Sequence, residues 1–250
     1  MDPSAEVRAA ANDTDGASGA YETMSVRELK DLLKRRGVDM SLAVEKEDLV
    51  RLAAAHEDFD AEARLIFERV NLEPGFRTRY SNADPIWQSP DTGARVYVGN
   101  LETARSREML QMHGISAVVN CQGLDSQNFF EDDPSVDYFR FPIATWAISG
   151  AKMDTREGVL AYFQPLWDWI DEKMEEQRSV LIHCLAGAHR AGTTGTAFLM
   201  YKENLPLEVA ISTAKTLRPI INPFGRLTTL LDRYGKALAA TRADEGEEGA

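Results

Sequence analysis

A cysteine and an arginine stand six positions apart in the stretch VLIHCLAGAHRAGTTG, residues 180–195. Cys184 follows an apolar segment that predicts a strand, and Arg190 precedes a segment that predicts a helix. The loop between them has small residues and contains Gly187, so its backbone N–H groups can turn inward toward the start of the helix. Inward amides together with the positive end of a helix bind anions.

A thiol at the base of such an anion site favours the thiolate form, which is the nucleophile. Arg190 adds a planar fork that matches two oxygens of a phosphoryl group. This spacing therefore predicts nucleophilic attack on phosphorus through a cysteinyl-phosphate intermediate. The alternative for Cys184 is a buried, inert thiol.

The elements that must position these residues alternate between strands and helices. The strands are predicted in RVYVGN, ISAVVNC, DYFRFPI and SVLIHC, with helical patterns between and after them. Fully apolar strands that alternate with helices predict an α/β domain with a central, mostly parallel sheet flanked by helices. Ligands of such sheets bind beyond the carboxyl ends of the strands, which is where Cys184 lies.

A small helical module is predicted ahead of this domain. Residues 1–20 and 241–250 have little to bury and predict disorder, the second as an acidic tail. Ser25 and Glu28 have the spacing of a capping box. The predicted divisions of the chain are 1–20 disordered, 21–56 helical module, 57–92 helix and linker, 93–240 catalytic domain and 241–250 tail.

HCLAGAHRAG resembles the His-Cys-x5-Arg signature of the protein tyrosine phosphatase superfamily, in particular its dual-specificity branch. RVYVGNLETARSREMLQMHGISAVVNC and LRPIINP resemble two further segments of that domain. The resemblance implies that Cys184 is the nucleophile and that His183 helps to fix the loop. It also implies that phosphate is held by the loop and the arginine: Leu185, Ala186, Gly187, Ala188, His189 and Arg190. His189 is expected at the rim or as a weak phosphate contact, in preference to a catalytic base.

Two positions depart from the family pattern. Ala191 follows the arginine, where relatives usually carry serine or threonine, and Thr145 stands where the family has its general acid aspartate. Asp154 is the nearest carboxylate downstream and is the candidate acid. Its alternative role is to cap the next helix in a capping box with Glu157.

Cys121 ends the strand ISAVVNC, and neighbouring parallel strands bring their carboxyl ends to the same edge of the sheet. Neighbouring strands lie about 4.8 Å apart, within the Cα separation that a disulfide needs. Some phosphatases of the superfamily carry a cysteine at a matching position, which implies a redox partner for Cys184. The alternative is that Cys121 is a small buried hydrophobic residue.

The loop carries no lysine, which disfavours inositol lipids, so the expected substrate is a phosphorylated protein. Phosphotyrosine is favoured, with phosphoserine and phosphothreonine also possible. The alternatives are a pseudophosphatase that binds phosphoproteins without turnover, and a glucan phosphatase that uses Trp146 as part of a sugar surface. No cofactor and no metal are expected.

Composition limits the partners and the compartment. The formal net charge of −12 argues against a general nucleic-acid binder, and no segment predicts a membrane span or a signal peptide. Two cysteines without a secretion signal indicate a reducing compartment, so we expect a cytoplasmic protein, with the nucleus as the alternative. Residues 21–56 resemble a SAP domain. Their mixed charges favour protein docking over nucleic-acid binding.

Overall fold

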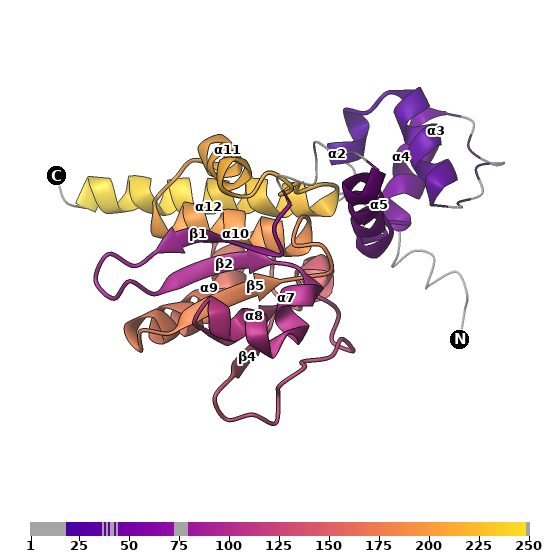
Figure 1. Cartoon of the computed structure of the whole chain (residues 1–250). Helices are drawn as coiled ribbons and strands as arrows, with labels where there is room; N and C mark the ends of the chain where they lie inside the picture. The colour runs from indigo at the N-terminus through magenta and orange to yellow at the C-terminus, as the bar shows by residue number, and fades with distance from the viewer. Residues whose placement is uncertain are drawn as a thin grey trace, which may run out of the picture.

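The computed structural model describes residues 19–36, 38, 40, 43, 45–72 and 80–248. A group of N-terminal helices packs at one end of a larger α/β domain (Figure 1). The predicted disordered start falls outside the described residues up to position 18. Helix α2 (Gly19–Glu22) includes the last two residues of that predicted segment.

A five-stranded sheet forms the centre of the α/β domain. Its order is β1-β2-β5-β3-β4, with β1 antiparallel to β2 at one edge and all other neighbours parallel. This confirms the predicted mostly parallel sheet and places β5 in its middle. The strands are β1 (Ala83–Gln88), β2 (Arg95–Gly99), β3 (Ile115–Asn120), β4 (Asp137–Arg140) and β5 (Ser179–His183).

Helices cover both faces of the sheet, as Figure 1 shows. Val98 and Ile182 point to the face covered by α9, α10 and α12, whereas Tyr97 and Leu181 point to the face covered by α7 and α8. This division follows from the alternation of side chains along a strand. The helices are α7 (Leu101–Arg105), α8 (Arg107–Met112), the 3-10 helix η1 (Ile143–Ile148), α9 (Arg156–Glu175), α10 (Arg190–Lys202), α11 (Leu207–Leu217) and α12 (Arg226–Glu248).

Strand β1 corrects the prediction of a helix and linker over residues 57–92, because residues 83–88 form a strand. Its pairing with β2 shifts register between Pro85 and Trp87. A proline lacks the N–H that a central strand needs, so Pro85 argues against a strand in the sequence. The strand is tolerated here because it lies at the edge of the sheet. Trp87 anchors this strand to the domain: its ring lies edge-on against Phe198, with 5.7 Å between centroids.

Two helix starts are set by single capping side chains. The helical segment between β2 and β3 is broken at Ser106, whose side chain accepts a hydrogen bond from the N–H of Met109 and begins α8. At α9 the cap is Thr155, which accepts from the N–H of Gly158 at 3.1 Å. The capping box predicted between Asp154 and Glu157 is therefore wrong, because the helix begins one residue later.

The N-terminal helices α3 (Val26–Arg35) and α4 (Lys46–Ala55) pack against each other around buried leucines. The capping box of Ser25 and Glu28 is present, which confirms that prediction. The next helix, α5 (Phe59–Leu72), leads toward the α/β domain. The resemblance of this module to a SAP domain stays a prediction.

A buried carboxylate joins the two parts of the chain. Glu57 accepts hydrogen bonds from the Tyr21 hydroxyl at 2.7 Å and from the N–H of Arg226 at 2.9 Å, and it pairs with the Arg226 guanidinium. Gly225 has a positive φ of 59°, and a Cβ there would lie 1.9 Å from Glu57 Oε1. The close approach of Glu57 therefore requires glycine at this turn.

The C-terminal helix corrects the prediction of a disordered tail from residue 241. Helix α12 continues to Glu248, because its late turns contact the domain. Arg156 pairs with Asp244, and Arg242 donates to the carbonyl of Met200. Among the described residues, no helix is long and apolar enough to cross a membrane.

Candidate active site

The signature loop, residues 184–190, connects the end of β5 to the start of α10 at the carboxyl edge of the sheet. Cys184 is only 2% exposed at the base of this loop. The backbone N–H groups of residues 186–190 donate to no other described residue. Helix α10 begins at Arg190, and His189 before it offers no side-chain cap. Free amides at a helix start are suited to bind an anion, and phosphate binding by this loop stays a prediction.

Gly187 fixes the curvature of the loop. Its φ is +68°, and a Cβ there would lie 2.5 Å from the carbonyl oxygen of Gly99 and 2.8 Å from Arg218 Nη2. Only glycine combines this backbone conformation with so close an approach. The loop is therefore wrapped tightly against the end of β2.

Arg218 holds the same loop from inside the domain. Its Nε donates to the carbonyl of Gly187 at 2.9 Å, and its Nη2 donates to the carbonyl of Ala186 at 3.2 Å. Its third nitrogen pairs with Asp84 on β1. Because these carbonyls point toward the buried Arg218, the peptide N–H groups of the loop are free to face the opposite side. Arg218 is the arginine of the segment LRPIINP that the sequence singled out.

The two histidines of the loop region are both buried, and burial lowers their pKa values. For His183 the pKa falls to about 4, with burial as the largest cause and the Arg190 cation opposing protonation as well. His189 Nδ1 lies 2.8 Å from the carbonyl oxygen of Asn222. Its pKa is lowered, again first by burial. Both imidazoles are therefore neutral near pH 7, which suits loop positioning more than proton transfer.

Arg190 reaches a carboxylate that the sequence did not point to. Its Nη2 pairs with Asp60 on α5, and its buried Nε has no partner. Helix α5 lies against the outside of the loop, where Ala63 and Ile66 pack with Ala186, Ala188 and Ile220. Asp60 stands far from Arg190 in the sequence, so spacing could not reveal it. The sequence signal that could have indicated this contact is the apolar face of α5, because an apolar helix face must pack against another part of the protein.

Cys121 lies beside the start of the signature loop. It follows Asn120, the residue paired with His183 between β3 and β5, and its N–H donates to the carbonyl of His183 at 2.9 Å. Its sulfur lies 3.4 Å from the Thr194 hydroxyl, and burial raises the pKa of Cys121 to about 12. The strands are adjacent, as the redox hypothesis requires, and both thiols are free.

The expected acid candidates lie away from the loop. Thr145 is exposed in η1, and its hydroxyl donates to the carbonyl of Pro142. Asp154 is exposed and lines a groove of about 320 Å³ with Arg233 and Lys236. No contact joins Asp154 to the signature loop within the described part of the chain. Asp137 pairs with Lys173 and Arg178 at the opposite edge of the sheet.

Trp146 is 3% exposed, with its ring packed under Arg233 at 5.2 Å. The sequence considered this ring as part of a sugar-binding surface. Because the ring is buried, it offers no platform for a glucan. In the described residues, no cluster of three or more His, Cys, Asp or Glu side chains is arranged to hold a metal ion.

Comparison with known proteins agrees with this geometry. A family model described as the dual specificity phosphatase catalytic domain matches residues 96–236, more than half of the chain. The chain belongs to this family. The matched residues run from β2 to α12 and include the whole signature loop.

Curated members of the family are moderately similar. Human dual specificity protein phosphatase 9 is 29% identical over 62% of this chain and 38% of its own length. Dual specificity protein phosphatase 4 of Gallus gallus is 31% identical over 60% of this chain and 37% of its own length. The match thus spans well under half of these relatives. A crystal structure of a variant of human DUSP28 has a TM-score of 0.50 at 22% identity, with 64% of this chain and 99% of that chain covered. It supports the fold.

Proposed function

We propose that the protein removes phosphoryl groups from phosphoproteins through a cysteinyl-phosphate intermediate. The observation that carries this proposal is the signature loop, in which Cys184 lies below unpartnered amides and beside Arg190. The thiolate attacks phosphorus, and the bond to the leaving oxygen breaks. Water then attacks the cysteinyl phosphate, releases inorganic phosphate and restores the thiolate.

Phosphotyrosine is the favoured substrate. A phenolate is a weaker base than the alkoxide of serine, so it departs more easily. Leu185, Ala186 and Ala188 add no cation to the loop, which suits a single phosphoryl group better than a highly charged inositol headgroup.

Hydrolysis of aryl phosphates and of matched phosphotyrosine and phosphoserine peptides tests this proposal. Cys184→Ser and Arg190→Ala should each lower kcat/KM by at least about 10⁴-fold, because residues that act as one unit fail together, while circular dichroism stays unchanged. Acid quench of the parent enzyme should trap phosphocysteine. Binding of phosphopeptide without turnover by the parent protein would instead favour the pseudophosphatase. Substantial turnover by Cys184→Ser would contradict the mechanism.

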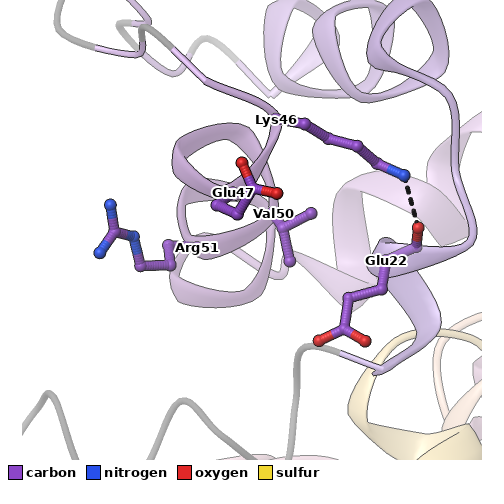
Figure 2. Close-up of a pocket in the computed structure, with 5 residues that line it drawn as sticks. All are labelled: Glu22, Lys46, Glu47, Val50 and Arg51. Atoms are coloured by element: carbon purple, nitrogen blue, oxygen red, sulfur yellow. Dashed lines mark hydrogen bonds between the residues drawn. The ribbon is translucent and has the colours of Figure 1, made fainter.

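The N-terminal module supports protein docking. A groove of about 460 Å³ there is lined by Glu22, Lys46, Glu47, Val50 and Arg51. Figure 2 shows Lys46 turned toward the Glu22 carbonyl, to which it donates at 2.6 Å, and Arg51 turned away from both. Clustered cations are needed to hold nucleic-acid phosphates, and this surface alternates charges. Retention on an oligonucleotide column at low salt would contradict protein docking as its use.

A further inference from the structure

The active site lacks a carboxylate where its family would place one, and it has a carboxylate elsewhere. Thr145 occupies the expected position, while Asp60 of α5 pairs directly with Arg190. The Asp60 side chain is 40% exposed and that of Arg190 is 8% exposed. The pair places a partly exposed carboxylate directly against the arginine of the signature loop.

Three consecutive residues fix the backbone just before Asp60. Glu57 is buried in its pair with Arg226. Asp58 Oδ1 accepts from the N–H groups of Asp60 and Ala61, at 3.0 and 2.9 Å, and so caps the start of α5. The Phe59 ring lies 5.0 Å from the ring of Phe224. The place of Asp60 is therefore set by a built interface and does not depend on its own ion pair.

A bound phosphoryl group would displace the Asp60 carboxylate from Arg190. Asp60 takes one nitrogen of Arg190, while the buried Nε and the amides of residues 186–190 remain without partners. A phosphoryl dianion can use all of them, so it outcompetes a single carboxylate oxygen for the fork. The released carboxyl group then lies beside the bound phosphoryl group.

We propose that Asp60 is the general acid of the dephosphorylation reaction, an inference that rests on the proposed function. In the first step the Cys184–phosphorus bond forms, the phosphorus–oxygen bond breaks, and the Asp60 proton goes to the leaving oxygen. In the second step the Asp60 carboxylate takes a proton from the attacking water as cysteinyl phosphate is hydrolysed. The proton returned to Asp60 closes the cycle.

Leaving groups of different basicity test this role. General acid catalysis contributes about 10²–10⁴-fold, and it matters most for basic leaving groups. Asp60→Asn should lower kcat on phenyl phosphate by about 10²-fold or more, and it should lower kcat on p-nitrophenyl phosphate far less. The alkaline limb of the kcat/KM profile on phenyl phosphate should flatten. Tyr21, Arg36, Glu62 and His189, the titratable groups that line the neighbouring groove, are common to both proteins.

The proposed function and this inference can fail separately. If Cys184→Ser hydrolyses p-nitrophenyl phosphate like the parent, the proposed function fails. If Asp60→Asn loses equal activity on both substrates, loses none, or gains activity, Asp60 is not the acid; a gain would show that it only competes with phosphate. A leaving-group-dependent loss in Asp154→Asn and not in Asp60→Asn would also overturn the inference.

Two matched comparisons separate chemistry from structure. Asp60→Glu and Asp60→Gln have equal size and differ in the carboxyl group, so only Asp60→Glu should retain activity on phenyl phosphate above the Asp60→Asn level. Equal rates in this pair would count against the inference. Asp91→Asn removes one charge from an exposed turn and should behave like the parent on both substrates.

Discussion

Arg190 is supported from two sides, and the two supports differ in construction. On the inside, the 1% exposed Arg218 side chain holds the signature loop through two carbonyls, and Gly187 lets the loop close against β2. On the outside, α5 covers the loop with small apolar residues and presents a partly exposed carboxylate. The inner support shapes the phosphate cradle that every substrate shares. The outer support bears on the leaving group, which differs between substrates.

Gly187→Ala attacks the inner support and should have the largest effect. The added Cβ meets the carbonyl of Gly99 at a positive φ, so the loop must shift. A misplacement near 1 Å can cost about 10²-fold in rate, and the strained backbone costs about 1–3 kcal/mol in stability. Rates on p-nitrophenyl and phenyl phosphate should fall together, with a lower Tm. A normal rate on either substrate would show that the loop tolerates the shift.

Glu57→Gln attacks the outer support. Glu57 lies just before α5, and the substitution removes the charge that pairs with Arg226. A buried polar group that is imperfectly satisfied lowers the free energy of unfolding by about 1–3 kcal/mol. The rate on phenyl phosphate should fall more than the rate on p-nitrophenyl phosphate, because α5 positions Asp60. Glu47→Gln, on the exposed face of α4, is the matched control and should change neither rate. Equal losses on both substrates would mean that α5 supports the signature loop and does not position Asp60 for catalysis.

The pH dependence of stability tests the burial of His183, the residue that precedes the signature loop. His183 has a pKa of about 4 in the folded protein because it is buried, whereas an unfolded histidine titrates near about 6.5. The unfolded state therefore binds more protons between these values, and stability falls as pH drops from 6.5 toward 4. The loss is on the order of 3 kcal/mol. Urea unfolding of the parent and of His183→Gln at both pH values measures it, and parallel losses would contradict this origin.

Cys121→Ser should have the smallest effect. The basal rate should stay near that of the parent, because Cys121 does not contact the phosphate cradle through any described bond. Peroxide converts the Cys184 thiolate to a sulfenic acid, which condenses with a neighbouring thiol to a disulfide and water. Mass spectrometry should find a Cys121–Cys184 peptide, and reductant should restore activity only in the parent. Equal recovery in the variant would leave Cys121 a packing residue.

Prediction from sequence worked best where interactions are local. The β5–loop–α10 connection follows from an apolar strand, small loop residues and a helical segment in direct succession, and the structure has all three. Prediction was weaker where distant segments compete for a position. Asp154 and Glu157 have capping-box spacing, but the N-cap residue of α9 is Thr155. Pro85 hid an edge strand whose partner β2 could not be inferred from local propensity.

By itself, the sequence determined the cysteine–arginine spacing of the signature loop and the parallel sheet that carries the loop. These depend on residue types within a few positions and on the alternation of strand and helix, which local geometry fixes. Only the tertiary structure decided which carboxylate reaches Arg190. Asp60 arrives there because α5 buries Ala63 and Ile66 against the loop and Glu57 against Arg226. Such contacts between distant segments leave no spacing in the sequence, since burial depends on how whole surfaces fit together.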